Sequence, residues 1–99
     1  WKNLKVRYTN MKLNKEKFLK TELGSNLYEC ITAWDCWLNL NYSVSRSKSI
    51  AWCQAQWEVY QMALKQFYGV EYHFTRTDEY FGVCTGDETD WLFKVEREV

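Results

Sequence analysis

The chain has 99 residues, and its 13 Lys/Arg balance its 13 Asp/Glu. A chain of this length buries only roughly two-thirds of its unfolded surface, so residues 1–99 are expected to form one domain with one core. Six Trp, seven Tyr and five Phe supply large side chains for that core. There is neither a long unbroken apolar run nor an apolar segment behind a basic start, which predicts no membrane span and no signal peptide and favours the cytoplasm.

The number and spacing of the cysteines predict free thiols, and neither a metal site nor a disulfide framework. Cys30, Cys36, Cys53 and Cys84 are even in number, but two of them fall within helical patterns and the chain shows no dense Cys spacing. Cys30 and Cys36 are six residues apart, which does not suit a zinc-binding pair. Glycine-rich phosphate loops and nucleotide fingerprints are also absent. We therefore expect four reduced, mostly buried thiols, no metal and no cofactor.

The first segment alternates apolar and polar residues. Leu4, Val6 and Tyr8 alternate with Lys and Arg, which predicts a half-buried strand over residues 4–9. Trp1, Leu4, Tyr8 and Met11 also fit helical steps of three and four, so a helix is the alternative.

Two helices are predicted between residues 14 and 40. Asn14 can cap a short first helix, and Gly24 stands where a left-handed residue after a helix is wanted. Ser25 can then cap a second helix, whose second half is expected to carry Asp35 and Asn39 outward. The apolar residues of that helix keep helical spacing: Leu27, Cys30, Ile31, Trp34, Trp37 and Leu38.

Residues 49–68 have the strongest helical pattern in the chain and predict a central helix. The polar, Ser-rich residues 41–49 are expected to form a loop that ends at a cap in Ser47 or Ser49, and Gly69 is expected to end the helix. Two apolar stripes make an arc wide enough to be covered on two sides by the rest of the chain. The first comprises Ile50, Cys53, Trp57, Tyr60, Leu64 and Phe67, and the second comprises Trp52, Ala55, Val59 and Ala63.

After residue 69 the apolar period changes to two, which predicts strands over residues 70–76, 80–85 and 91–97. Pairing Phe74 with Val83, and Val83 with Phe93, places the apolar side chains on one face, Trp91 and Val95 included. The predicted fold class is therefore α+β, in the order β-α-α-α-β-β-β. The aromatic face of a small antiparallel sheet is expected to pack on the central helix.

One pair of residues could carry catalysis. The register places His73, the single histidine, across from Cys84, so a Cys/His nucleophile is geometrically conceivable. An activated thiolate needs a sheltered, electropositive pocket and an oxyanion donor, which the exposed face of a small sheet does not supply. We therefore predict that the protein is not an enzyme.

The two ends of the chain carry opposite charge. Residues 1–20 contain seven cations and one Glu, a composition that suits nucleic-acid backbones: Lys2, Lys5, Arg7, Lys12, Lys15, Lys17 and Lys20. The predicted turns at residues 77–79 and 86–90 are acidic and could face a basic partner. Their carboxylates are Asp78, Glu79, Asp87, Glu88 and Asp90.

A short Lys/Asn/Tyr-rich opening, the lack of proline and a single aromatic core resemble the small accessory proteins of phages that infect low-GC Gram-positive bacteria. That resemblance implies a stoichiometric inhibitor of host machinery, a class that includes anti-CRISPR proteins. The leading hypothesis is a non-enzymatic protein in the host cytoplasm that blocks a larger protein or ribonucleoprotein through its acidic turns. We prefer residues 86–90, which concentrate three carboxylates. Nucleic-acid binding through the basic opening is the alternative.

Overall fold

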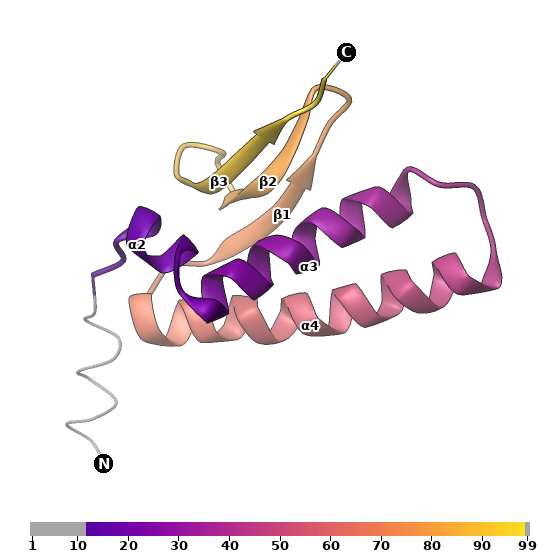
Figure 1. The fold of residues 1–99 in the computed structure, drawn as a ribbon. Coiled ribbons are helices and arrows are strands. Elements are labelled where there is room, and N and C mark those ends of the chain that lie inside the picture. Colours follow the sequence, from indigo (N-terminus) through magenta and orange to yellow (C-terminus); the bar gives the residue numbers. More distant parts are fainter. Residues whose placement is uncertain (1–11, 99) are drawn as a thin grey trace.

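A computed structural model describes residues 12–98 of the chain. Three helices precede a three-stranded antiparallel sheet (Figure 1), so the α+β class is confirmed, while the strand predicted over residues 4–9 lies outside the described residues. The elements are α2 (Lys15–Leu19), α3 (Glu22–Leu38), α4 (Val44–Tyr68), β1 (Tyr72–Arg76), β2 (Tyr80–Thr85) and β3 (Trp91–Glu96).

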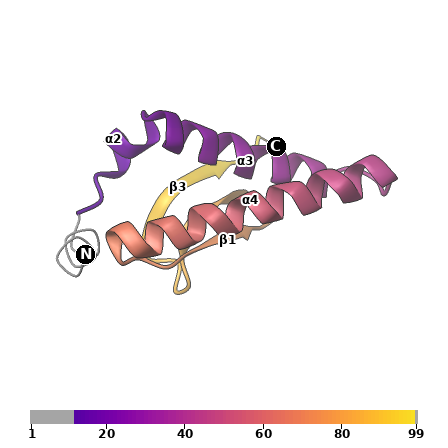
Figure 2. The ribbon, with the colours of Figure 1, turned by 90° about the horizontal axis from the view of Figure 1, so that it is seen from below.

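The molecule has two layers. The long helices α3 and α4 form an antiparallel hairpin, and the sheet, in the order β1-β2-β3, lies against one side of it (Figures 1 and 2). The short helix α2 sits beside the end of α4, where the rings of Phe18 and Tyr68 meet edge to face with centroids 6.2 Å apart. The hairpin is therefore covered by the sheet on one side and by α2 at the end of α4.

The first helix begins as predicted, but the second begins earlier. Asn14 caps α2 by accepting a hydrogen bond from the backbone N–H of Lys17. The cap of α3 is Thr21, whose hydroxyl accepts from the N–H of Gly24 at 3.1 Å, so the predicted cap at Ser25 is wrong. Gly24 is not a terminator either. It lies inside α3, where an added Cβ would be 2.0 Å from the carbonyl oxygen of Phe18, so its missing side chain allows α2 to pack closely.

The central helix is also longer than predicted. It starts at Val44, with Ser43 as its cap, so the predicted loop over residues 41–49 is wrong from residue 44 onward. The Arg46 guanidinium donates from Nε to the carbonyl oxygen of Trp37 at 3.0 Å and ties the first turn of α4 to the end of α3. That tertiary contact holds a Ser-rich turn in helical form. Gly69 ends the helix with φ 72°, as predicted.

The predicted register of the sheet is confirmed, with one change. Phe74 pairs with Val83, and Val83 pairs with Phe93. A register shift between Val83 and Cys84 then opposes Cys84 to Trp91, which is the signature of a β-bulge. The prediction that Trp91 faces the core is therefore wrong: it lies on the outer face with Cys84, and Leu92 is buried instead.

The inner face of the sheet packs on the central helix, as predicted, and also on α3. Trp34 of α3 stacks on Phe74 with centroids 4.4 Å apart, and Tyr28 contacts Phe93 at 5.1 Å. The side chain of Gln61 in α4 reaches only the first strand, where it donates to a backbone carbonyl oxygen. One core joins both layers: Phe18, Leu27, Ile31, Trp57, Leu64, Tyr72, Phe81, Val83 and Leu92.

The two apolar stripes of α4 differ in how far their side chains are buried. Cys53, Trp57 and Leu64 of the first stripe are buried. In the second stripe, Trp52 and Val59 remain 60% and 61% exposed, so the prediction that the rest of the chain covers this side is wrong for the described residues. Within residues 12–98, no helix is long and apolar enough to span a membrane.

Candidate functional site

The acidic turn, residues 86–90, is held in one conformation by its own side chains. One carboxylate oxygen of Asp87 accepts hydrogen bonds from the hydroxyls of Thr85 and Thr89, at 2.7 and 2.8 Å, and from the N–H of Thr89 at 3.2 Å. These bonds, the one from Thr85 first, lower the pKa of Asp87 below its ordinary value. The exposed Asp87 therefore stays ionised at neutral pH and has a fixed direction.

Glu88 occupies a backbone region that side chains rarely adopt. Its φ is 58°, while its N–H donates to the carbonyl oxygen of Thr85 at 2.9 Å. Its own carbonyl oxygen accepts from the indole N–H of Trp91 at 3.1 Å, and its carboxylate accepts from the hydroxyl of Tyr80 at 3.3 Å. The left-handed turn thus places the Glu88 carboxylate over the outer face of the sheet.

The third carboxylate of the turn, Asp90, joins the two oppositely charged ends of the chain. Its carboxylate forms an ion pair with the ammonium of Lys15 in α2. The ammonium of Lys20, another residue of the predicted nucleic-acid stretch, lies 3.5 Å from a carboxylate oxygen of Glu16. Lys12 and Lys17 are exposed. The remaining members, Lys2, Lys5 and Arg7, lie outside the described residues. Within residues 12–98, part of the basic stretch is therefore neutralised by local acids.

Two aromatic rings lie beside the acidic turn on the outer face of the sheet. Trp91 and Tyr80 meet edge to face with centroids 5.5 Å apart, and the ammonium of Lys94 lies 4.2 Å from the Tyr80 ring. Gly82 lies beneath the indole, since an added Cβ would be 3.1 Å from it. We call Tyr80, Glu88 and Trp91 with Asp87 the acidic aromatic surface. Sequence reasoning missed Trp91 because the β-bulge that turns it outward left no pattern in the apolar period.

The second predicted acidic turn, residues 77–79, lies at the other end of β2. Asp78 and Glu79 are exposed, and about six residues at 3.3 Å separate the two turns by roughly 20 Å. The structure therefore brings Asp87, Glu88 and Asp90 together, and it leaves Asp78 and Glu79 apart from them.

The Cys/His pair has the predicted register but not an accessible thiol. His73 and Cys84 are Cα partners, and His73 is exposed. Cys84 is fully buried, and its sulfur lies 3.3 Å from the hydroxyl of Thr75. A substrate in solution has no route to a thiol in this position, so the pair does not present an accessible nucleophile.

Asp35 is buried, although the sequence pattern predicted that it would point outward. It is 4% exposed and binds Arg97 through two parallel hydrogen bonds of 2.6 and 2.7 Å. Arg76 donates from Nε to the same carboxylate at 2.9 Å. The sequence signal for this burial lies in the strands. Because side chains alternate along a strand, Arg76 is on the inward face with Phe74, and Arg97 is on the inward face with Val95. Inward cations at the ends of two strands require a carboxylate opposite them.

The environment of Asp35 fixes its charge. Burial opposes ionisation, but the hydrogen bonds and charges of Arg97 and Arg76 outweigh it and lower the pKa of Asp35. Asn39 adds an amide donor at 3.3 Å from the carboxylate. This network connects the end of α3 to β1 and to the residue after β3, so we assign it a structural role.

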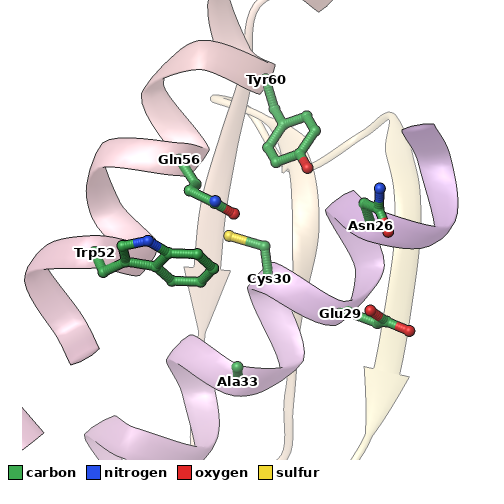
Figure 3. A pocket seen from close by; sticks show the side chains of 7 residues that line it. All are labelled: Asn26, Glu29, Cys30, Ala33, Trp52, Gln56 and Tyr60. Atoms are coloured by element: carbon green, nitrogen blue, oxygen red, sulfur yellow. The ribbon is translucent and has the colours of Figure 1, made fainter. Parts of the chain in front are cut away.

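A pocket of about 410 Å³ opens between α3 and α4 on the side away from the sheet (Figure 3). Trp52, Gln56 and Tyr60 line it from α4, and the buried thiol of Cys30 lies at its floor. Burial, first, and the neighbouring Cys53 raise the pKa of Cys30 to about 11. A thiol with so high a pKa is protonated at neutral pH, so the pocket does not contain an activated nucleophile.

Among the described residues, no three His, Cys, Asp or Glu side chains gather closely enough to hold a metal ion. No family model, curated protein or solved structure matches the chain. The candidate site therefore rests on the geometry of the described residues, and the acidic aromatic surface is the arrangement that best fits binding.

Proposed function

We propose that this protein is a non-enzymatic binding protein that inhibits a larger macromolecule by protein–protein contact. The contact is made through the acidic aromatic surface and the adjoining Asp90. In this proposal the chain acts in a host cytoplasm, as the inhibitors carried by phages of low-GC Gram-positive bacteria do, and a CRISPR nuclease is a candidate target. The observation that supports it is the placement of Trp91 and Tyr80 beside the fixed carboxylates of Asp87 and Glu88.

The rigidity of the turn favours binding. Asp87 is fixed by hydrogen bonds within the turn, and Glu88 by its backbone and by Tyr80. A partner that contacts these carboxylates therefore orders few side chains, which keeps the entropic cost of association low. Carboxylates fixed in this way complement a basic groove such as a nucleic-acid-handling protein presents, and they raise the rate of association with it.

The aromatic rings give the surface a hydrophobic contact area in addition to its carboxylates. Trp and Tyr are the residues that most often dominate the energy of protein interfaces, because they bury much area at little conformational cost. Trp91 and Tyr80 are half-buried and oriented by contacts to Glu88, so they are already close to a binding geometry. The expected interface therefore has an aromatic centre and an acidic rim.

The first experiment is a pull-down from lysate of a low-GC Gram-positive bacterium at moderate salt, with and without nuclease. We expect one stoichiometric protein to be retained after nuclease treatment. The affinity of that protein is then measured for the wild type and for Asp87→Ser/Glu88→Ser/Asp90→Ser. We expect weaker binding of the variant and a salt-dependent loss of association rate in the wild type.

The matched control is Asp78→Ser/Glu79→Ser, which removes carboxylates at the opposite end of β2. It should leave the affinity unchanged, and thermal melting should show that both variants are folded. Unchanged affinity of a folded triple variant would remove the acidic aromatic surface as the contact. Loss of the bound material on nuclease treatment would favour the alternative, in which case Lys12→Ser/Lys17→Ser should weaken nucleic-acid binding.

A further inference from the structure

The outer face of α4 is apolar although it is opposite the core. Its exposed side chains, Trp52, Ala55, Val59 and Met62, recur at steps of three and four and so form one stripe, which we call the outer stripe. Trp52 lies at the edge of this stripe, where it also lines the pocket between α3 and α4. Met62 is 65% exposed and Val59 61%. A helix that is apolar on two opposite faces is expected to be covered on both, but the described elements of one chain cover only the side towards α3 and the sheet.

The area of the outer stripe is large enough to indicate an interface. A large aromatic side chain has roughly 150–250 Å² of surface, so Trp52, which is 60% exposed, leaves about 90–150 Å² in water, and the exposed Val59 and Met62 add to this area. An exposed apolar patch of a few hundred Å² marks an interaction site more often than it marks ordinary surface. The exposed Lys48, four residues before Trp52, ends the apolar row, so the outer stripe from Trp52 to Met62 is about 15 Å long.

The charge pattern indicates the kind of partner. Between residues 49 and 64, α4 contains a single charged residue, Glu58, and this residue lies beside the outer stripe and not on it. Depletion of charge is the compositional mark of an interface core. The outer stripe therefore has no charge to complement a basic or an acidic partner, and it fits a surface that is as apolar as itself.

We infer that the occupant of the outer stripe is the outer stripe of a second copy of this chain, packed antiparallel in a two-fold dimer. With the two-fold axis level with Trp57, Trp52 lies across from the second copy's Met62, and Ala55 lies across from the second copy's Val59. Small residues then meet larger ones, and the thioether meets the indole, which is a favourable contact. The axis lies one residue from the middle of α4, so nearly the whole helix is paired.

The dimer does not depend on the proposed function, and it is compatible with it. The outer stripe faces away from the sheet, so both copies would keep the acidic aromatic surface accessible. An interface of standard size buries about 800 Å² on each partner. The side chains around the outer stripe, including Lys48, Gln56 and Gln66, supply the polar rim that such an interface needs.

Sedimentation equilibrium over a concentration series tests the inference. We expect the wild type to reach about twice its monomer mass of 12.0 kDa. Val59→Glu and Ala55→Lys should each raise the dissociation constant at least about tenfold, because each buries an unpaired charge. Gln54→Lys, on an exposed side of α4 away from the outer stripe, is the matched control and should leave the constant unchanged.

Mixing the two charged variants tests the antiparallel arrangement. Lys at position 55 of one chain should face Glu at position 59 of the other, so the mixture should recover mixed dimers that neither variant forms alone. A wild type that stays monomeric at millimolar concentration would overturn the inference and assign the outer stripe to a different partner. Wild-type-like dimers of folded Val59→Glu and Ala55→Lys would overturn it too, and a mixture without recovery would refute the antiparallel pairing. If Val59→Glu fails to fold, Met62→Lys replaces it, and the mixture is then made from Met62→Lys and Trp52→Glu.

Discussion

The two sides of the helical hairpin show how similar residues can have opposite roles. On the side towards the sheet, Trp57 is 5% exposed and belongs to the core, whereas Trp52, five residues earlier in the same helix, is 60% exposed. Both residues lie in apolar stripes with helical spacing. The difference between them shows that apolar spacing identifies a helix face that is suited to burial. The neighbouring elements determine which of these faces is buried.

The largest effect is expected at Trp57. Trp57→Ala should lower the free energy of unfolding by about 3–5 kcal/mol, because it leaves a large cavity in the core. Trp52→Ala should change the free energy of unfolding of the monomer by no more than about 0.5 kcal/mol, because its ring lies on the surface. Chemical denaturation at low protein concentration, where the monomer dominates, measures both. Equal losses in the two variants would mean that the two sides of α4 do not differ.

The next largest effect is expected at Asp35, on the sheet-facing side of α3. Asp35→Asn should cost about 2–3 kcal/mol, because it removes a charge that two partly buried guanidinium groups depend on. Glu29→Gln, an exposed position on the same helix, is the matched control and should be near neutral.

The effect of Asp35 should depend on pH in a defined direction. Because its pKa is lowered in the folded protein, its contribution is fully present above the ordinary aspartate pKa of about 4 and is lost as the pH falls through the lowered value. The stability difference between the wild type and Asp35→Asn should be constant from pH 7 to pH 5 and should shrink at lower pH. A difference that grew on acidification would contradict the assignment of the charge.

A smaller effect is expected at Gly24, where two principles oppose each other. Replacing a helical Gly with Ala normally stabilises a helix by about 1 kcal/mol. Here the new Cβ would be 2.0 Å from the carbonyl oxygen of Phe18, so Gly24→Ala should instead destabilise by about 1–3 kcal/mol as α2 is displaced. Ser25→Ala, on the exposed side of the same turn, should be neutral or slightly stabilising. A more stable Gly24→Ala would show that α2 does not pack as described.

The smallest perturbation is the chemical modification of the thiols, which probes the two sides without mutation. The exposed Cys36 should react rapidly with a thiol reagent in the native protein. Cys30, Cys53 and Cys84 should react slowly, since they are buried, and since burial raises the pKa of Cys30 to about 11. All four thiols should react after denaturation without a reductant, and mass spectrometry should count four adducts. Two adducts would indicate a disulfide.

The sequence by itself determined those features that depend on local pattern. The cap at Asn14, the left-handed Gly69 and the pairing of Phe74 with Val83 follow from short-range chemistry and from the period of apolar residues, and the structure confirms them. The acidic residues of the candidate site were visible in the sequence for the same reason, because Asp87 and Glu88 stand in a turn between two strands.

Only the tertiary structure decided which side of each element is covered. Asp35 is buried because Arg76 and Arg97 arrive from distant strands, and Trp91 turns outward because a bulge shifts the register by one residue. The helix start at Val44 depends on the contact of Arg46 with α3. These features arise from contacts between segments that are far apart in the chain. A local pattern specifies that a residue needs a partner, but only the packing of the whole chain determines which partner it meets.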